Sequence, residues 1–105
     1  MKTKIFLMIL LTCLSVAAGQ VTILWDANPE PDITGYKVYI GTESRNYSET
    51  IQVIDGTSVS LDTFVEGITY FCNVTAYNFA GLESDFSEEL VFTVPLSPPS
   101  NLKIK

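Results

Sequence analysis

Short runs of β-branched and aromatic residues recur about every ten residues along this chain, and clusters of Pro, Gly, Asn and Asp separate them. This spacing is typical of an antiparallel β-sandwich, because each run fits one strand and each cluster fits a turn. No helical period of apolar residues competes with it. We predict strands at residues 21–25, 36–40, 50–54, 57–61, 69–78 and 90–94. The expected fold is therefore all-β, an antiparallel sandwich of six to seven strands around one core.

Alternate residues of a strand point to opposite faces of its sheet, so the sequence also predicts which side chains are buried. Trp25 shares the phase of Val21 and Ile23, which places its indole in the core. The other expected core residues are Tyr36, Val38, Tyr70 and Val74. The opposite phase carries Lys37, Tyr39, Phe71, Asn73, Thr75 and Tyr77, which we expect on the outer face.

The first nineteen residues have the three parts of a secretory leader. Lys2 and Lys4 precede an apolar run at residues 5–14, and small residues follow at 15–19. The run is shorter than the roughly 20 residues that span a bilayer, so we expect no transmembrane segment. We predict a cleaved signal peptide at residues 1–19, one domain at 20–95 and a proline-rich tail at 96–105. The expected location is extracellular, with the periplasm and the cell surface left open.

Cys13 offers an alternative end to the leader. The sequence Leu-Leu-Thr-Cys at residues 10–13 is similar to a lipoprotein box, in which the cysteine is acylated and becomes the first residue. Thr12 is bulkier than the residue that usually precedes such a cysteine, so we favour cleavage after Ala18 or Gly19 and leave lipid anchoring open. Cleavage there leaves Cys72 as the one cysteine of the mature chain, which then contains no internal disulfide.

Acidic residues dominate the charge of the chain. Twelve Asp and Glu face six Lys and Arg, and removal of Lys2 and Lys4 with the leader leaves a net charge of −8. Such a surface repels phosphate, and no basic stripe is present to bind it. We therefore expect no nucleic-acid partner.

Several motifs taken together resemble the fibronectin type III family. They are Trp25, the strand Gly35-Tyr36-x-Val38-x-Ile40, the strand Gly67-x-x-Tyr70-x-x-x-Val74-x-Ala76-x-Asn78, and the following Gly81 and Ser84. The resemblance covers about residues 21–94 and implies an immunoglobulin-like sandwich with Trp25 and Tyr36 in the core. It also makes Tyr70 the tyrosine corner, whose hydroxyl bonds the backbone of the preceding turn. It implies little about function, because this fold carries many functions.

One departure from the family concerns the first strand. The leader ends almost directly on the tryptophan strand, so the opening strand of the family is expected to be missing. The tail at residues 97–105 resembles that opening strand, with Leu102 and Ile104 as its apolar positions. A bare sheet edge is usually covered, so one hypothesis is that the tail completes a neighbouring copy by β-augmentation. The alternatives are that the chain is a fragment, or that the tail is a linker.

The sequence argues against catalysis. It contains no histidine, which removes the usual general base and the commonest metal ligand. Cys72 has the inward phase of a buried thiol. Asp26, Glu30 and Asp32 lie in one loop, but their spacing matches no recognised calcium loop, so we expect no metal and no cofactor.

The outward aromatic residues favour recognition. Tyr39, Tyr77 and Phe79 offer flat faces to a protein or a sugar ring, although such residues also stabilise cross-strand pairs. We predict a secreted, non-catalytic binding or adhesion module. The alternatives are a self-assembling structural subunit and, more distantly, an accessory domain of an extracellular glycoside hydrolase.

Asn46-Tyr47-Ser48 and Asn73-Val74-Thr75 both fit the N-glycosylation pattern of secreted proteins. Short triplets of this kind also arise by chance, so they carry little weight on their own.

Overall fold

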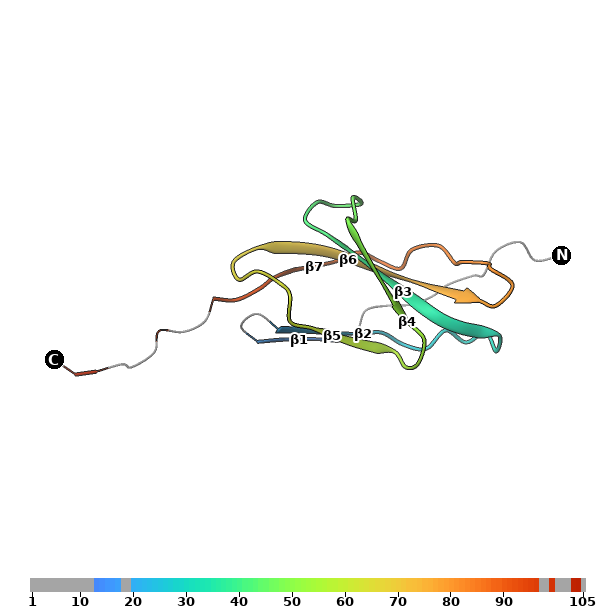
Figure 1. Cartoon of the computed structure of the whole chain (residues 1–105), viewed down its shortest axis with the longest axis horizontal. Helices are drawn as coiled ribbons and strands as arrows, with labels where there is room; N and C mark the ends of the chain where they lie inside the picture. Colours follow the sequence, from blue (N-terminus) through green and yellow to red (C-terminus); the bar gives the residue numbers. More distant parts are fainter. Residues whose placement is uncertain (1–12, 18–19, 97–98, 100–102, 105) are drawn as a thin grey trace.

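The chain folds into two antiparallel β-sheets that pack face to face (Figure 1). The computed structural model describes residues 13–17, 20–96, 99 and 103–104. Its strands are β1 (Cys13–Ala17), β2 (Gln20–Leu24), β3 (Ile33–Gly41), β4 (Glu49–Val53), β5 (Ser58–Leu61), β6 (Thr69–Asn78) and β7 (Leu90–Thr93). One sheet has the order β1-β2-β5 and the other the order β4-β3-β6-β7. The predicted all-β sandwich is confirmed, and the described part of the chain contains no helix that is long and apolar enough to cross a bilayer.

The inner faces of the two sheets form one apolar core. In the centre of the larger sheet Val38 pairs with Val74, and both side chains are fully buried. Trp25 packs edge-on against Tyr36 from the opposite sheet, with ring centroids 5.5 Å apart, and both rings are buried. Each such side chain contributes about 1.5–3 kcal/mol through burial, so packing of these side chains stabilises the sandwich.

Tyr70 closes one end of this core. The backbone N–H of Val65 donates a 2.9 Å hydrogen bond to the Tyr70 hydroxyl, which ties the preceding turn to β6. The Tyr70 ring packs against Phe64 and Phe92, with centroids 4.6 and 5.8 Å away. Gly67 completes the turn with a φ of 83°, a conformation that glycine adopts without a steric penalty.

The edge of the three-stranded sheet differs from our expectation. We expected the edge beside residues 21–25 to be vacant, but β1 pairs with β2 along its whole length, from Ala17 opposite Gln20 to Cys13 opposite Leu24. β1 lies inside the predicted leader, where we assigned no strand. The expectation of a vacant edge is therefore wrong for the full chain and applies only to a chain that has lost residues 1–19.

The outer face of β6 is more enclosed than the alternation predicted. Asn73 is fully buried and Thr75 is nearly so, although both lie on the face turned away from the core. Residues 82–87, which contain no regular strand, hydrogen-bond along the edge of β6: Ser84 N–H donates to the Ala76 carbonyl at 2.8 Å. This segment positions its own side chains over the sheet and builds the site described next.

Candidate binding site

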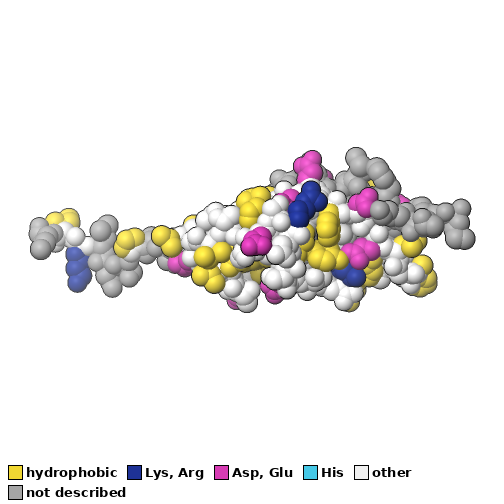
Figure 2. All heavy atoms as spheres, turned by 90° about the horizontal axis from the view of Figure 1, so that it is seen from above, with side chains coloured by type: hydrophobic (Ala, Val, Ile, Leu, Met, Phe, Trp, Pro, Cys, Tyr) yellow, Lys and Arg dark blue, Asp and Glu magenta, His cyan; other side chains and the backbone are white. Residues whose placement is uncertain are grey.

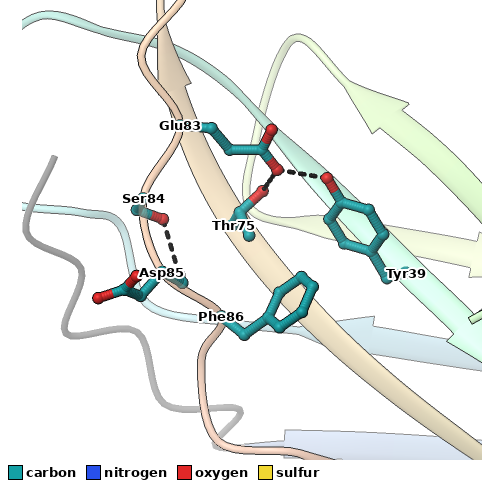
Figure 3. A pocket seen from close by; sticks show the side chains of 6 residues that line it. All are labelled: Tyr39, Thr75, Glu83, Ser84, Asp85 and Phe86. Carbon is teal, nitrogen blue, oxygen red and sulfur yellow. Dashed lines mark hydrogen bonds between the residues drawn. The ribbon is translucent and has the colours of Figure 1, made fainter. Parts of the chain in front are cut away.

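A hollow of about 290 Å³ opens on the outer face of the four-stranded sheet. It is lined by side chains from β3, from β6 and from the irregular segment before β7: Tyr39, Thr75, Glu83, Ser84, Asp85 and Phe86 (Figure 3). Its volume is close to the lower end of the roughly 300–1,000 Å³ that is usual for ligand pockets. The hollow therefore suits a small group, such as one sugar ring or one side chain of a partner.

Two of the residues that line the hollow, Tyr39 and Phe86, pack with Tyr47, and we call these three rings the outer-face aromatic cluster. The Phe86 ring lies edge-on to both tyrosines, with centroids 5.1 Å from Tyr39 and 5.5 Å from Tyr47. Phe86 is 43% exposed, so part of its ring faces solvent. The face of the molecule seen from above carries hydrophobic side chains next to both acidic and basic ones (Figure 2). The cluster thus combines a fixed geometry with accessible apolar surface.

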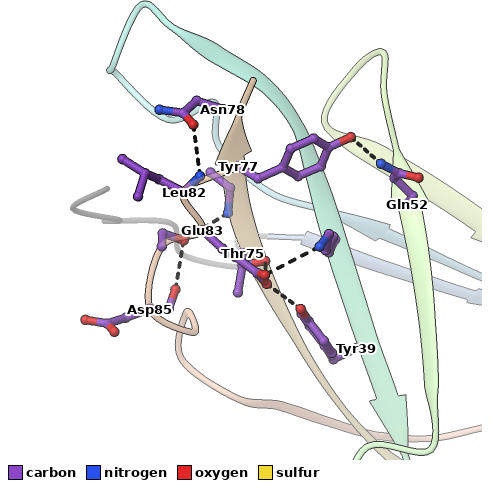
Figure 4. Close-up of polar contacts among 11 residues, drawn as sticks. Tyr39, Gln52, Thr75, Tyr77, Asn78, Leu82, Glu83 and Asp85 are labelled. Carbon is purple, nitrogen blue, oxygen red and sulfur yellow. Dashed lines mark hydrogen bonds and ion pairs between the residues drawn. The ribbon is translucent and has the colours of Figure 1, made fainter. Parts of the chain in front are cut away.

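Glu83 provides the polar wall of the hollow (Figure 4). Its Oε2 accepts hydrogen bonds from the Tyr39 hydroxyl and from the Thr75 hydroxyl, the latter at 2.7 Å. Its Oε1 lies 3.4 Å from Lys37 Nζ and forms an ion pair with it. A carboxylate has about four acceptor sites, so Oε1 retains capacity for one further donor.

The contact between Glu83 and Tyr39 determines the protonation state of each. Burial favours the neutral carboxylic acid of Glu83, but the hydrogen bonds from Tyr39 and Thr75 and the charge of Lys37 outweigh it and lower the pKa of Glu83. Burial, the hydrogen bond to Glu83 and the charge of Glu83 raise the pKa of Tyr39 to about 12. At neutral pH the site therefore holds a carboxylate beside a protonated phenol.

Glu89 holds the loop that carries Tyr47. Its carboxylate accepts hydrogen bonds from the Ser44 hydroxyl at 2.7 Å, the Arg45 backbone N–H at 3.0 Å and the Tyr47 hydroxyl at 2.6 Å. Arg45 has a φ of 64°, which is uncommon for a residue with a side chain, so the loop has a defined and locally strained shape. Hydrogen bonds from Tyr47 and Ser44 lower the pKa of Glu89.

The predicted surface residues lie in different places. Tyr39 lines the hollow, as described. Tyr77 lies on the same face, where its hydroxyl accepts a 2.6 Å hydrogen bond from Gln52 and Lys37 Nζ lies 5.4 Å from its ring centroid. Phe79 is 90% exposed in the turn after β6 and does not line the hollow. The structure thus brings Tyr39 and Tyr77 onto one face and leaves Phe79 outside the site.

Sequence reasoning missed Tyr47, Glu83 and Phe86. Tyr47 follows a turn, and the other two belong to a stretch without alternation between the strands predicted at residues 69–78 and 90–94. A usable signal was present, because Phe86 is a large apolar residue between polar neighbours and no predicted strand buries it.

Two candidate nucleophiles among the described residues, Cys72 and Tyr39, are not activated. Cys72 is fully buried, and burial raises the pKa of its thiol to about 12, which is the opposite of an activated nucleophile. Tyrosine is the nucleophile of some glycoside hydrolases, but an activated nucleophile needs a lowered pKa, and that of Tyr39 is raised. Among the residues described, no three His, Cys, Asp or Glu side chains gather as a metal site would require.

Comparison with known protein families identifies the fold. The model of the fibronectin type III domain matches residues 10–93. The chain belongs to the fibronectin type III family. The match begins before β1, so it includes the strand that we did not predict, and it ends at the last residue of β7. No curated protein sequence matches the chain significantly.

Solved structures show the same fibronectin type III fold. The third fibronectin III domain of human KIAA0343 protein is 18% identical, with a TM-score of 0.73 over 96% of this chain and 91% of that domain. An Fn3-like protein from Clostridium thermocellum is 23% identical, with a TM-score of 0.68 over 93% of this chain and all of that one. A β-1,2-glucanase from Parabacteroides distasonis is 21% identical, with a TM-score of 0.71 over 84% of this chain but 12% of the enzyme. These likenesses show the fold, and the family match supports a binding or structural module in general.

Proposed function

We propose that the chain is exported, that residues 1–19 are removed, and that the mature domain is a non-catalytic recognition module for extracellular carbohydrate. The observation that carries the proposal is the hollow beside the outer-face aromatic cluster. A sugar presents both an apolar ring face and hydroxyl donors, and here the half-exposed Phe86 and the carboxylate-bearing Glu83 line the same hollow. The ring stacks on Phe86 while one hydroxyl donates to Glu83 Oε1.

The proposed site is built to recognise rather than to react. Tyr39 and Thr75 hold the Glu83 carboxylate in place before any ligand arrives, so little side-chain freedom is lost on binding. An ionised Glu83 accepts hydrogen bonds but has no proton to donate to a leaving group.

A glycan array followed by calorimetry tests this proposal. We expect Phe86→Ala and Glu83→Gln each to weaken binding about tenfold or more, which corresponds to roughly 1.4 kcal/mol. Phe79→Ala is the matched control, because Phe79 is an exposed aromatic residue outside the hollow and its removal leaves binding unchanged. A protein ligand in place of a sugar, or equal losses in Phe79→Ala and Phe86→Ala, contradicts the proposal and favours an adhesion module with another surface.

The glucanase that shares this fold favours a second candidate, an accessory domain of an extracellular glycoside hydrolase. In this candidate the domain binds the polysaccharide that its enzyme cleaves. Binding confined to β-glucans on the array supports this candidate, and binding confined to other glycans excludes it.

A further inference from the structure

β1 is the edge strand of its sheet. Its register with β2 shows which types of residue this edge requires. It pairs only with β2 within its sheet, with position 14 opposite Ile23 and position 16 opposite Val21. Both partners on β2 are fully buried. Residues directly opposite in an antiparallel pair share a face, so positions 14 and 16 belong to the core face and require apolar residues. The sequence of β1, Cys-Leu-Ser-Val-Ala, has Leu and Val there.

The C-terminal segment repeats this pattern. Residues 101–105 read Asn-Leu-Lys-Ile-Lys, with aliphatic residues again at the second and fourth places. Placed in the register of β1, Leu102 lies opposite Ile23 and Ile104 opposite Val21. Lys103 then lies opposite Thr22, whose hydroxyl is on the other face and contacts the Ser60 hydroxyl at 2.8 Å. The segment therefore satisfies the three central positions of the edge.

We propose that residues 101–105 of one copy replace β1 on the next copy after the leader has been removed, so that the mature protein assembles head to tail. This inference goes beyond the proposed carbohydrate recognition and uses only its statement that residues 1–19 are cleaved. Cleavage removes all of β1 and leaves unpaired the backbone donors and acceptors of β2 that face away from β5, an edge that readily accepts a strand.

The direction of the chain favours a neighbouring copy over the same copy. In Figure 1, β7 leads to the left, and the end of β1 and the start of β2 also lie on the left of their sheet. A replacement for β1 must therefore run from right to left along β2. A second domain in the same orientation, placed further to the left, would meet a chain that leaves β7 toward the left and that already runs in this direction. To pair within its own domain the tail must first return along the sandwich, and residues 95–100 span at most about 20 Å.

Charge supports the same contact. Residues 20–96 contain all twelve acidic residues of the chain but only two basic ones, Lys37 and Arg45. The tail contributes Lys103 and Lys105, which are half of the basic residues after position 19. Lys103 and Ile104 are exposed, so the described part of this segment is not packed on its own domain. A basic tail and an acidic domain attract each other between copies.

Register-specific cross-linking tests the proposal. The full gene is expressed in a secreting host and the product purified, with its mass showing that residues 1–19 are absent. The test variant combines Thr22→Cys with Lys103→Cys, which the proposed register places opposite each other at a Cα separation of about 4.5–5.5 Å, within reach of a disulfide. The control combines Thr22→Cys with Lys105→Cys, two residues out of register. Cys72 is buried and stays in both.

We expect a ladder of disulfide-linked oligomers from the test variant and at least fivefold less from the control. A disulfide within one chain shows pairing in cis and overturns the proposal. Equal cross-linking of the two variants, or none in either, also overturns it. A product that retains residues 1–19 overturns the inference together with the proposed cleavage, whereas the glycan array tests the binding function independently.

Sedimentation of the mature protein gives a second measurement that does not depend on new cysteines. Leu102→Asp with Ile104→Asp places charges at the two core-face positions and is expected to convert assemblies into monomers. Leu96→Asp is the matched control, because Leu96 is an exposed aliphatic residue before the donor segment and its replacement leaves assembly intact. A wild-type protein that remains monomeric at high concentration contradicts the proposal.

Discussion

The Tyr47 hydroxyl donates a 2.6 Å hydrogen bond to the carboxylate of Glu89, a residue 42 positions later in the chain. The contact joins the loop after β3 to the segment that leads into β7. Tyr47 packs against Phe86 and Tyr39, so the same bond fixes one side of the outer-face aromatic cluster. The geometry of the proposed site therefore depends on a glutamate that does not line it.

Replacement of Glu89 by Gln should destabilise the protein at neutral pH. The carboxylate accepts three hydrogen bonds, but it is partly exposed to solvent, so we expect a loss of about 1 kcal/mol or less in the free energy of unfolding. Urea denaturation measures it. Glu88→Gln is the control, because no hydrogen bond to the Glu88 side chain is found among the described residues, and it should have almost no effect.

The loss of stability in Glu89→Gln should depend on pH. The pKa of Glu89 is lower in the folded state than its ordinary value, so its stabilisation is present above the unfolded-state pKa and is lost as the pH falls through the folded-state pKa. The stability difference between wild type and Glu89→Gln should shrink as the pH is lowered from 7 into this acid range. A difference that does not change with pH contradicts the proposed role of the charge.

The strands were predictable because alternation is a local property of the sequence. β6 begins and ends where its pattern does, at Thr69 and Asn78, since burial selects the side chains of its inner face. The cover over its outer face was not predictable in this way. Glu83, Phe86 and Ser87 contact β6 or β3 from a segment without period, and only the tertiary structure brings them there. β1 was missed because a leader and a strand are both short and apolar.

Removal of the charge at position 83 should lower the pKa of Tyr39. The value of about 12 arises from burial, then from the hydrogen bond to Glu83 and its charge. In Glu83→Gln the last two effects weaken, and the pKa should move back toward the ordinary value of about 10. Titration of the tyrosine ring carbons by NMR measures it, with Tyr39→Phe used to assign the signal. An unchanged titration in Glu83→Gln shows that burial alone sets the pKa.

Loss of the Tyr70 hydroxyl should cost more stability than loss of the Tyr77 hydroxyl. Tyr70→Phe leaves the Val65 N–H without its acceptor and should lower the free energy of unfolding by about 1 kcal/mol, or the melting temperature by about 4–8 °C. Tyr77→Phe removes an acceptor from the exposed Gln52 side chain, which water replaces, so the change should stay within about 0.5 kcal/mol. Thermal unfolding compares the two, and equal losses contradict the role given to Tyr70.

The two glycosylation triplets should behave differently in a host that modifies them. Asn46 is exposed in a turn, where its amide donates to the Glu43 carboxylate at 2.9 Å, and a glycan at this position projects into solvent. Asn73 is fully buried, and its Oδ1 accepts a 2.9 Å hydrogen bond from Ser87, so the fold has no room for a glycan there. Intact mass of the secreted protein should show a glycan that Asn46→Gln removes and Asn73→Gln does not.

Asn73→Gln should instead destabilise the domain by about 1–3 kcal/mol, because it breaks a buried hydrogen-bonded contact. A folded protein with a glycan on Asn73 contradicts the enclosed outer face of β6.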